Sequence, residues 1–258
     1  MPGAGKIIQG YGGAALALAL LCVPADPAAA FDGYTLALTW QPAFCAAHGD
    51  RAECKAAAQS PLVLHGLWPD WDVNGDGRRD GGDAYCLDAG PARDSVIAAD
   101  KGDGGWNDLP EITLSKAIRA DLPAVMPGAQ SHLDRHEWWK HGTCSGLKPD
   151  DYFTAAILLT RQAQLGALGK FLADHQGQTV MLQDLLAVFD QELGAGSRRA
   201  LKVTCDRTDQ GTASLLTEIQ ISLRRDRIAD GLLSTTLETG GKAPRGRCGP
   251  RILIQASK

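Results

Sequence analysis

The stretch His65-Gly66-Leu67-Trp68-Pro69-Asp70 follows directly on a short apolar run, Leu62 to Leu64, which predicts a strand that delivers His65. A second stretch, His136-Glu137-Trp138-Trp139-Lys140-His141-Gly142-Thr143-Cys144, begins about seventy residues later. Together they contain three histidines, a carboxylate and an ammonium. A pair of histidines can act as base and acid near neutral pH, because the unperturbed pKa of histidine is about 6.5. A lysine and a third histidine can stabilise developing charge, so these residues indicate proton transfer around a phosphate.

The second stretch is predicted to be helical. Ser131 and Asp134 have the S-x-x-D spacing of a capping box, and Gly142 follows the last expected helical residue, as a C-terminal cap often does. Residues three and four apart share a helix face. The polar heads expected to converge on one stripe are therefore His136, Glu137, Lys140 and His141. Trp138 and Trp139 diverge from that stripe, and at least one of them is expected to anchor the helix in the core.

A zinc protease is the alternative interpretation of the same stretch. Its H-E-x-x-H motif places two histidine ligands four residues apart on one helix face. Here Lys140 occupies the position of the second ligand, and the next histidine, His141, falls one residue later. This spacing and the cationic lysine argue against a metal centre.

The two stretches resemble the active-site segments of the T2 family of ribonucleases. HGLWPD followed by HEWWKHGTC stands in that family's order, and the segment from Leu36 to Cys45, LALTWQPAFC, is similar to its first strand and the turn that follows. The resemblance spans roughly residues 31–254 and is specific in these three places.

The resemblance implies a catalytic role for four residues and a phosphate-binding role for a fifth. His65 is similar to the general acid that protonates the leaving 5′ oxygen, and His141 to the general base that takes the proton of the ribose 2′-OH. Glu137 and Lys140 resemble the pair that steadies the pentacoordinate phosphorane. His136 resembles a phosphate ligand.

Trp68 and Asp70 resemble the family's base-binding positions. The ring would stack on a base, and the carboxylate would accept a hydrogen bond from an exocyclic amine. Stacking of this kind contributes roughly 1–3 kcal/mol and tolerates any base, so low base specificity is expected. A core role for Trp68 and a turn role for Asp70 remain open.

The implied activity is that of a metal-independent endoribonuclease that cleaves single-stranded RNA. The 2′-OH attacks the adjacent phosphorus to give a 2′,3′-cyclic phosphate, which water opens to a 3′-phosphate. No cofactor is required, and DNA is not cleaved because it lacks the nucleophile. The protein is expected to be a monomer. A non-catalytic, secreted RNA- or nucleotide-binding protein on the same scaffold is the alternative function.

Residues 1–30 are expected to be a signal peptide. Lys6 precedes an apolar run from Ile7 to Val23, and Ala28-Ala29-Ala30 resembles a cleavage site. A membrane anchor or a lipoprotein at Cys22 is the alternative, but the interrupted apolar run and the poor lipobox disfavour both. Residues 31–258 are then one periplasmic or secreted domain with no membrane association.

Six cysteines remain after that cleavage, and an even number in an exported chain predicts three disulfides. Six cysteines allow fifteen pairings, so the spacing leaves the connectivity open. The family resemblance suggests Cys86–Cys144 and Cys205–Cys248, with Cys45–Cys54 as the remaining pair.

The expected fold is α+β, a single domain with a central antiparallel sheet flanked by helices and stapled by disulfides. Strands are expected over residues 31–40, 62–64, 201–205, 215–223 and 251–254. Helices are expected over 46–60, 112–122, 152–175 and 180–193, whereas residues 70–108 read as an irregular, Gly- and Asp-rich excursion.

The net charge of −4 is unusual for a protein that binds a polyanion. The signal peptide carries one lysine and one aspartate, so its removal leaves this charge unchanged. Cleavage needs positive charge only at one phosphate, and protonated histidines would supply it. We therefore expect better activity at mildly acidic pH.

A loop in the acidic excursion has the spacing of a calcium-binding loop. Its candidate ligands for a structural calcium are Asp72, Asn74, Asp76, Asp80 and Asp83. An aspartate replaces the usual final glutamate, and no helix is expected before the loop. A Gly/Asp surface turn is the equally acceptable interpretation. A secreted, calcium-stabilised interaction domain would be a third class of function.

Overall fold

The structure is a computed structural model that describes Met1 and residues 31–55, 60–70, 84–103, 105–208, 211, 213–240 and 246–257. The expected signal peptide, Met1 apart, and the candidate calcium ligands Asp72, Asn74, Asp76, Asp80 and Asp83 lie outside the described residues. Among the helices that are described, none is both long and apolar enough to cross a bilayer.

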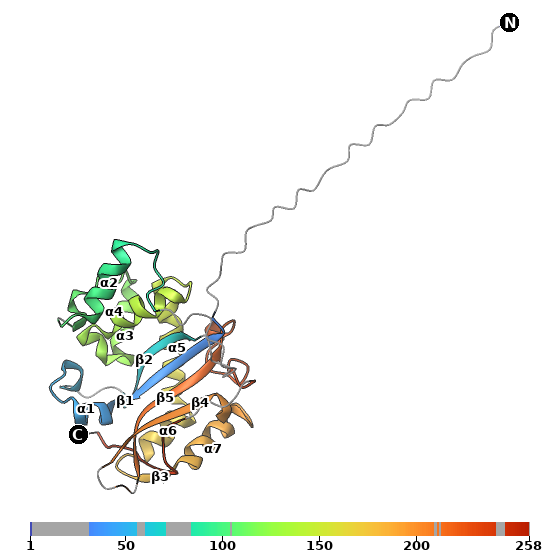
Figure 1. Cartoon of the computed structure of the whole chain (residues 1–258). Helices are drawn as coiled ribbons and strands as arrows, with labels where there is room; N and C mark the ends of the chain where they lie inside the picture. Colours follow the sequence, from blue (N-terminus) through green and yellow to red (C-terminus); the bar gives the residue numbers. More distant parts are fainter. Residues whose placement is uncertain are drawn as a thin grey trace.

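A six-stranded sheet forms the centre of the molecule (Figure 1). Its strands are β1 (Gly33–Trp40), β2 (Leu62–Asp70), β3 (Thr179–Met181), β4 (Leu201–Arg207), β5 (Ser214–Arg224) and β6 (Arg251–Leu253). They lie in the order β2-β1-β5-β6-β3, and β4 also pairs with β5. The pairs are antiparallel except β5–β6, which is parallel. The α+β fold with a mainly antiparallel sheet is therefore confirmed.

Seven helices surround the sheet within the described residues. They are α1 (Gln41–Ala47), α2 (Pro91–Lys101), α3 (Lys116–Val125), α4 (Leu133–Lys140), α5 (Pro149–Leu165), α6 (Ala167–Asp174) and α7 (Leu182–Leu193). Figure 1 shows α2, α3 and α4 gathered beyond β2, whereas α6 and α7 lie toward β3 and β4. The helices that bring residues to the site thus stand at the β2 edge.

The two faces of the sheet differ in character because strand side chains alternate. On β1, Leu36 and Leu38 are completely buried in the main core, where they join Tyr152 and Phe153 of α5. The opposite face of β1 carries small residues, Ala37 and Thr39 among them. That second face is the one that holds the polar residues of the site.

Several element predictions were wrong, each for a local reason. The excursion at 70–108 contains α2, which begins at a proline in the first turn, a favourable helix start. The single helix expected over 152–175 is two, since the backbone is extended at Gly166. In place of the helix expected over 46–60, the structure has an earlier helix, α1, which ends at Ala47. A short 3₁₀ turn at Ala52–Cys54 follows it.

Three disulfides link Cys45 to Cys54, Cys86 to Cys144 and Cys205 to Cys248. These are the pairings that the resemblance suggests. The second bond joins the segment before α2 to the turn after α4. Next to it, the backbone N–H of Tyr85 donates to the carbonyl of Lys140 at 2.8 Å, so Tyr85 and Cys86 are held against the end of the helix.

Candidate active site

A β-bulge in β2 sets the direction of His65. Ala37 pairs with Gly66 and Leu38 pairs with Leu64, so His65 is an extra residue on β2. In a regular strand His65 and Trp68 would point to opposite faces, because they are three residues apart. With the bulge their rings meet, and the ring centroids are 5.1 Å apart. The strand therefore presents both side chains to one side.

Gly66 lets α4 approach the strand closely. A Cβ at this position would overlap both the Glu137 carboxylate and the Trp68 indole nitrogen. Those two groups are in contact, since Trp68 Nε1 donates to Glu137 Oε2 at 2.7 Å. Glu137 is almost wholly buried, with 1% of its side chain exposed. A residue without a side chain is thus needed at position 66 of the first motif, because the Glu137 carboxylate of the second motif fills the space where a Cβ would lie.

The second motif forms α4, as the spacing predicts, but its ends differ from the prediction. The N-cap is His132, in the left-handed region at φ 61°, and no side chain caps the helix. The Ser131 hydroxyl instead donates to Glu53 Oε2 at 2.5 Å, so the predicted capping box with Asp134 is wrong. Gly142 does not adopt a left-handed cap; a Cβ there would overlap the Trp138 ring.

The two tryptophans of α4 anchor it as expected. Trp138 is buried in the main core and lies edge-on to Tyr152, with centroids 5.7 Å apart. Trp139 is partly buried and its Nε1 donates to the carbonyl of Pro110 at 2.8 Å. Contacts of Trp138 and Trp139 therefore fix the rotation of α4, and with it the direction in which the polar stripe points.

The polar stripe of α4 meets the two residues presented by β2. His65 Nε2 lies 3.7 Å from Glu137 Oε1, and His136 Nε2 lies 4.0 Å from the same oxygen. The Trp68 and His141 ring centroids are 5.5 Å apart, so His65 and His141 both contact the same indole. The two motifs therefore form one cluster around Glu137 and Trp68.

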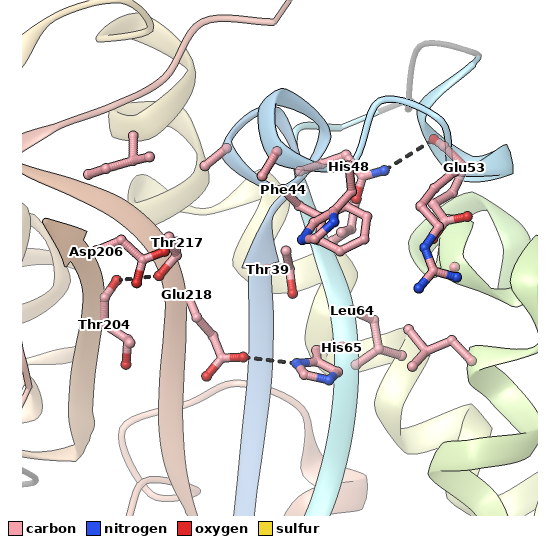
Figure 2. A pocket seen from close by; sticks show the side chains of 18 of the residues that line it. Thr39, Phe44, His48, Glu53, Leu64, His65, Thr204, Asp206, Thr217 and Glu218 are labelled. Atoms are coloured by element: carbon pink, nitrogen blue, oxygen red, sulfur yellow. Dashed lines mark hydrogen bonds and ion pairs between the residues drawn. The ribbon is translucent and has the colours of Figure 1, made fainter. Parts of the chain in front are cut away.

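His65 has a carboxylate partner that neither motif contains. Its Nδ1 lies 2.9 Å from Glu218 Oε2, across the central strand β1. Figure 2 shows Glu218 on β5 reaching over β1 to His65 on β2. Glu218 Oε1 accepts a hydrogen bond from Gln220 Nε2 at 2.6 Å, so both of its oxygens are engaged.

His136 also has a carboxylate partner, from the excursion. His136 Nδ1 lies 2.7 Å from Asp100 Oδ1, and the Tyr85 hydroxyl donates to the other oxygen of Asp100. The Asp100 side chain is only 3% exposed. Trp106 stacks on the His136 ring, with centroids 4.6 Å apart. Helix α2 and the 3₁₀ turn Gly105–Asp108 thus complete this side of the site.

The protein environment pushes the pKa values of the histidines in opposite directions. Burial disfavours the charged form of His65, but the hydrogen bond to Glu218 and the charge of Glu137 outweigh it and raise the pKa of His65 above its usual value. At His141, burial and the positive charges of Lys140 and His136 act together and lower the pKa to about 3.

Glu137 and His136 are shifted mainly by burial. The pKa of Glu137 rises to about 7, since desolvation outweighs the attraction of His65 and the hydrogen bond from Trp68. The pKa of His136 is lowered by burial, although Asp100 opposes this. Glu137 Oε1 is buried and lacks a hydrogen-bond partner among the described residues. An unsatisfied buried oxygen between two imidazoles is a natural place for a ligand to bind.

His136, Glu137 and His141 each offer a ligand atom within 4.8 Å of the others, which is a spacing that a metal ion could use. However, the charge of Lys140 acts on all three groups and lowers each of their pKa values. An ammonium in this position already supplies the positive charge, and it repels a dication. The electrostatics therefore favour proton transfer over metal binding.

The two candidate base-binding residues both have partners in the protein. Trp68 holds Glu137 and packs between two histidine rings. Asp70 ends β2, where its Oδ2 accepts a hydrogen bond from the Thr35 hydroxyl at 2.7 Å. These contacts give each residue a structural role in addition to any contact with a base.

A cavity of about 470 Å³ opens beside His65. Its walls include Thr39, Phe44, His48, Arg51 and Arg247 as well as Glu218. Figure 2 shows His65 and Glu218 on its floor and the Phe44 and His48 rings above them. A volume of this size is in the range of small-molecule sites and could hold a nucleoside.

The sequence of this chain matches the model of the Ribonuclease T2 family over residues 31–231. The chain belongs to the ribonuclease T2 family. It is 34% identical to ribonuclease I of Escherichia coli over 239 residues, which cover 87% of this chain and 86% of that protein. Membership of this family and the similarity to ribonuclease I identify the protein as an endoribonuclease.

Solved structures show the same fold for this T2 ribonuclease. Ribonuclease MC1 from the seeds of bitter gourd is 19% identical with a TM-score of 0.51, over 86% of this chain and 100% of that one. A self-incompatibility ribonuclease of Nicotiana alata is 18% identical with a TM-score of 0.53, over 87% and 99%. A variant of ribonuclease MC1 has been solved in complex with 5′-UMP.

Three site residues of this T2 ribonuclease lie outside both motifs: Glu218, Asp100 and Trp106. Glu218 is 153 residues from its partner His65 in the chain, and Asp100 is 36 residues from His136. The alternation of β5 gives one available signal, since Glu218 and Gln220 lie between buried residues of a half-buried strand. Nothing in the excursion marks Asp100, because it is one of many aspartates there.

Proposed function

We propose that this T2 ribonuclease cleaves RNA with His65 as general acid and His141 as general base. The observation that carries the proposal is the meeting of both imidazoles at Trp68 beside the buried Glu137 carboxylate, and the opposite directions of their pKa shifts agree with it. His65 stays protonated at a pH where His141 is neutral, which is the state that the first step requires. Both rings contact Trp68, so one substrate phosphate near this indole could be reached by both.

The reaction is an in-line transesterification. His141 takes the proton of the ribose 2′-OH while the 2′ oxygen forms a bond to phosphorus. The bond from phosphorus to the 5′ oxygen breaks, and His65 gives its proton to that oxygen. The product is a 2′,3′-cyclic phosphate. Water opens it when His65, now neutral, takes a proton from water and His141 returns its own to the 2′ oxygen, leaving a 3′-phosphate.

Lys140, Glu137 and His136 serve the phosphate. Lys140 neutralises charge on the phosphorane oxygens. Glu137 can contribute only as the protonated acid, because a carboxylate would repel the phosphate, and its pKa of about 7 permits this at acidic and neutral pH. Its unsatisfied Oε1 faces His65 and His136, where a phosphate oxygen would lie. His136, oriented by Asp100, binds another phosphate oxygen.

The cavity beside His65 accommodates the leaving nucleoside. His65 protonates the 5′ oxygen, so the nucleoside that carries this oxygen must lie on the His65 side of the phosphate. The cavity walls combine rings and arginines, which suit bases and phosphates without selecting one base. The exposed parts of Trp68 and Asp70 would contact the base on the other side, and low base specificity follows.

The decisive test is the chemistry of the product ends. Oligoribonucleotides are incubated with the purified protein in EDTA, and the fragments are analysed for 2′,3′-cyclic phosphate. We expect cyclic ends, a later appearance of 3′-phosphate, and no cleavage of the matching DNA. A metal requirement would contradict the mechanism. Tight RNA binding without cleavage would instead support the alternative of a non-catalytic RNA-binding protein.

The same proposal includes export and processing. Three disulfides among the described residues suit an oxidising compartment, so we expect a periplasmic or secreted monomer cleaved before Phe31. Mass spectrometry of the native protein tests the cleavage site, and light scattering tests the oligomeric state. Thermal unfolding measured with and without calcium tests whether the acidic loop binds this ion. An unchanged Tm would rule out a structural calcium.

A further inference from the structure

Glu218 occupies an unusual place for the partner of an active-site histidine. It pairs with Thr39 on β1, and β1 in turn separates β5 from β2. Two strand spacings amount to about 10 Å, so Glu218 must cross the whole central strand to reach His65. Figure 2 shows the Glu218 side chain and its contact with His65 passing over β1.

The chemistry of the contact fixes the proton on His65. An ionised carboxylate can only accept hydrogen bonds, so the nitrogen that faces Glu218 must be the donor, Nδ1–H. Burial opposes ionisation of Glu218, but its hydrogen bond with His65 prevails and lowers the pKa of Glu218. The other ring nitrogen, Nε2, then points toward Glu137 and the expected phosphate position, where the transferable proton is needed.

We propose that Glu218 is a positioning residue for His65: it holds the imidazole so that Nε2 faces the leaving oxygen, and its charge keeps the ring protonated until that oxygen departs. The inference rests on the proposed function, in which His65 is the general acid. A carboxylate that orients a catalytic imidazole through its second ring nitrogen is a recurring arrangement in enzymes.

The other charges around His65 cannot replace Glu218. From α4, His65 is faced by Glu137, His136 and Lys140, with His141 just beyond the end of the helix. Three of these four are basic, and Glu137 itself is neutral over much of the acidic range because its pKa is about 7. Glu218 is therefore the carboxylate that remains ionised beside His65 when the enzyme works.

Glu218 is itself held in one orientation. Gln220 Nε2 donates to Glu218 Oε1, and Lys202 on the neighbouring strand adds a positive charge. In Glu218→Gln, the new amide would keep its oxygen toward Gln220 and turn its NH₂ toward His65. The Nδ1 atom would then become an acceptor, so the variant keeps the shape of the site but disfavours the doubly protonated imidazolium that serves as the acid.

The first experiment measures kcat and KM for a dinucleoside phosphate from pH 4 to 9 in Glu218→Gln and Glu218→Ala. We expect kcat to fall by about 10–100-fold with little change in KM, since a misplaced acid loses part of its contribution. The alkaline limb should move to lower pH. Glu238→Gln is the matched control: it removes the same charge beyond the far end of β5, where Glu238 accepts from the Gly240 N–H, and should behave as wild type.

The second experiment separates positioning from a structural role. A uridine 3′-phosphate ester of 4-nitrophenol has a leaving group that departs without a proton. On this substrate the Glu218 variants should regain most of their lost rate, to within about threefold of wild type, because general acid catalysis is no longer required. An equal loss on both substrates would overturn the proposal and indicate a distorted site.

The outcome for His65 distinguishes this inference from the proposed function. If His65→Ala is inactive on RNA but recovers on the nitrophenyl ester, His65 is the general acid. Unchanged kcat and an unchanged alkaline limb in Glu218→Gln would then refute the positioning role alone. If His65→Ala stays active on RNA, the proposed function itself fails.

Discussion

The two sides of the active site treat the same side chain in opposite ways. The sheet side places His65 beside the Glu218 carboxylate, whose hydrogen bond raises the pKa of His65 against the opposing effect of burial. The helix side places His141 beside Lys140 and His136, in a buried position, and its pKa falls to about 3. Both are ordinary histidines in the sequence. In the proposed mechanism, acid and base are therefore distinguished by the charges that the fold brings to each ring.

The largest expected effect comes from removing either ring. His65→Ala and His141→Ala should each lower kcat by about 10²–10⁴-fold, and the double variant should lose little more than one of them, because they act as a unit. His175→Ala is the control, since that ring stacks on Phe171 at the end of α6. Steady-state rates on RNA measure the effect, and independent, multiplying losses would break the assignment of a joint acid and base.

A smaller but still large loss of activity is expected when the contact between the sheet side and the helix side of the active site is disturbed. In Gly66→Ala the new methyl overlaps the Glu137 carboxylate and the Trp68 nitrogen, so these two groups must move from their places against β2. A displacement of about 1 Å at a reacting centre can cost about 100-fold in rate. Activity should fall by that order while circular dichroism shows a folded protein. Full activity would mean that Glu137 need not lie against β2.

The pH profile tests the difference between the sides without any substitution. His65 and Glu137 must be protonated, and the Glu137 pKa of about 7 sets an upper limit, so activity should fall as pH rises above that value. His141 must be neutral, and with a pKa of about 3 it is neutral at every higher pH. Loss of the Glu137 proton alone gives about a 30-fold decline from pH 6 to 8.5, and loss of the His65 proton adds to it, so we expect a broad acidic optimum and a decline of at least about 30-fold over this range. A rate that rises through neutrality would reverse the two roles.

The sequence predicts the motif residues, the disulfides and the class of fold, because each of these depends on local spacing or family pattern. His65, Glu137 and His141 meet as expected, since one strand and one helix present them. The β-bulge at His65 was not predictable, because it depends on pairing between β1 and β2. Glu218 and Asp100 were missed for the same reason: an ion pair across 153 residues leaves no local pattern.

The smallest effect is expected on the helix side, where Asp100 holds His136. Asp100→Asn keeps the shape of the side chain but removes the buried charge that accepts from His136 Nδ1–H and the Tyr85 hydroxyl. Because His136 is proposed to bind phosphate and not to transfer a proton, KM for a dinucleoside phosphate should rise by about tenfold with kcat less affected.

Asp94→Asn on the exposed face of α2 is the control for the loss of charge and should leave both constants unchanged. A large fall in kcat for Asp100→Asn, with a shifted pH profile, would show that His136 moves protons as well. His136 would then join His65 and His141 among the groups that transfer protons, and Lys140 would be left to stabilise charge without transferring a proton.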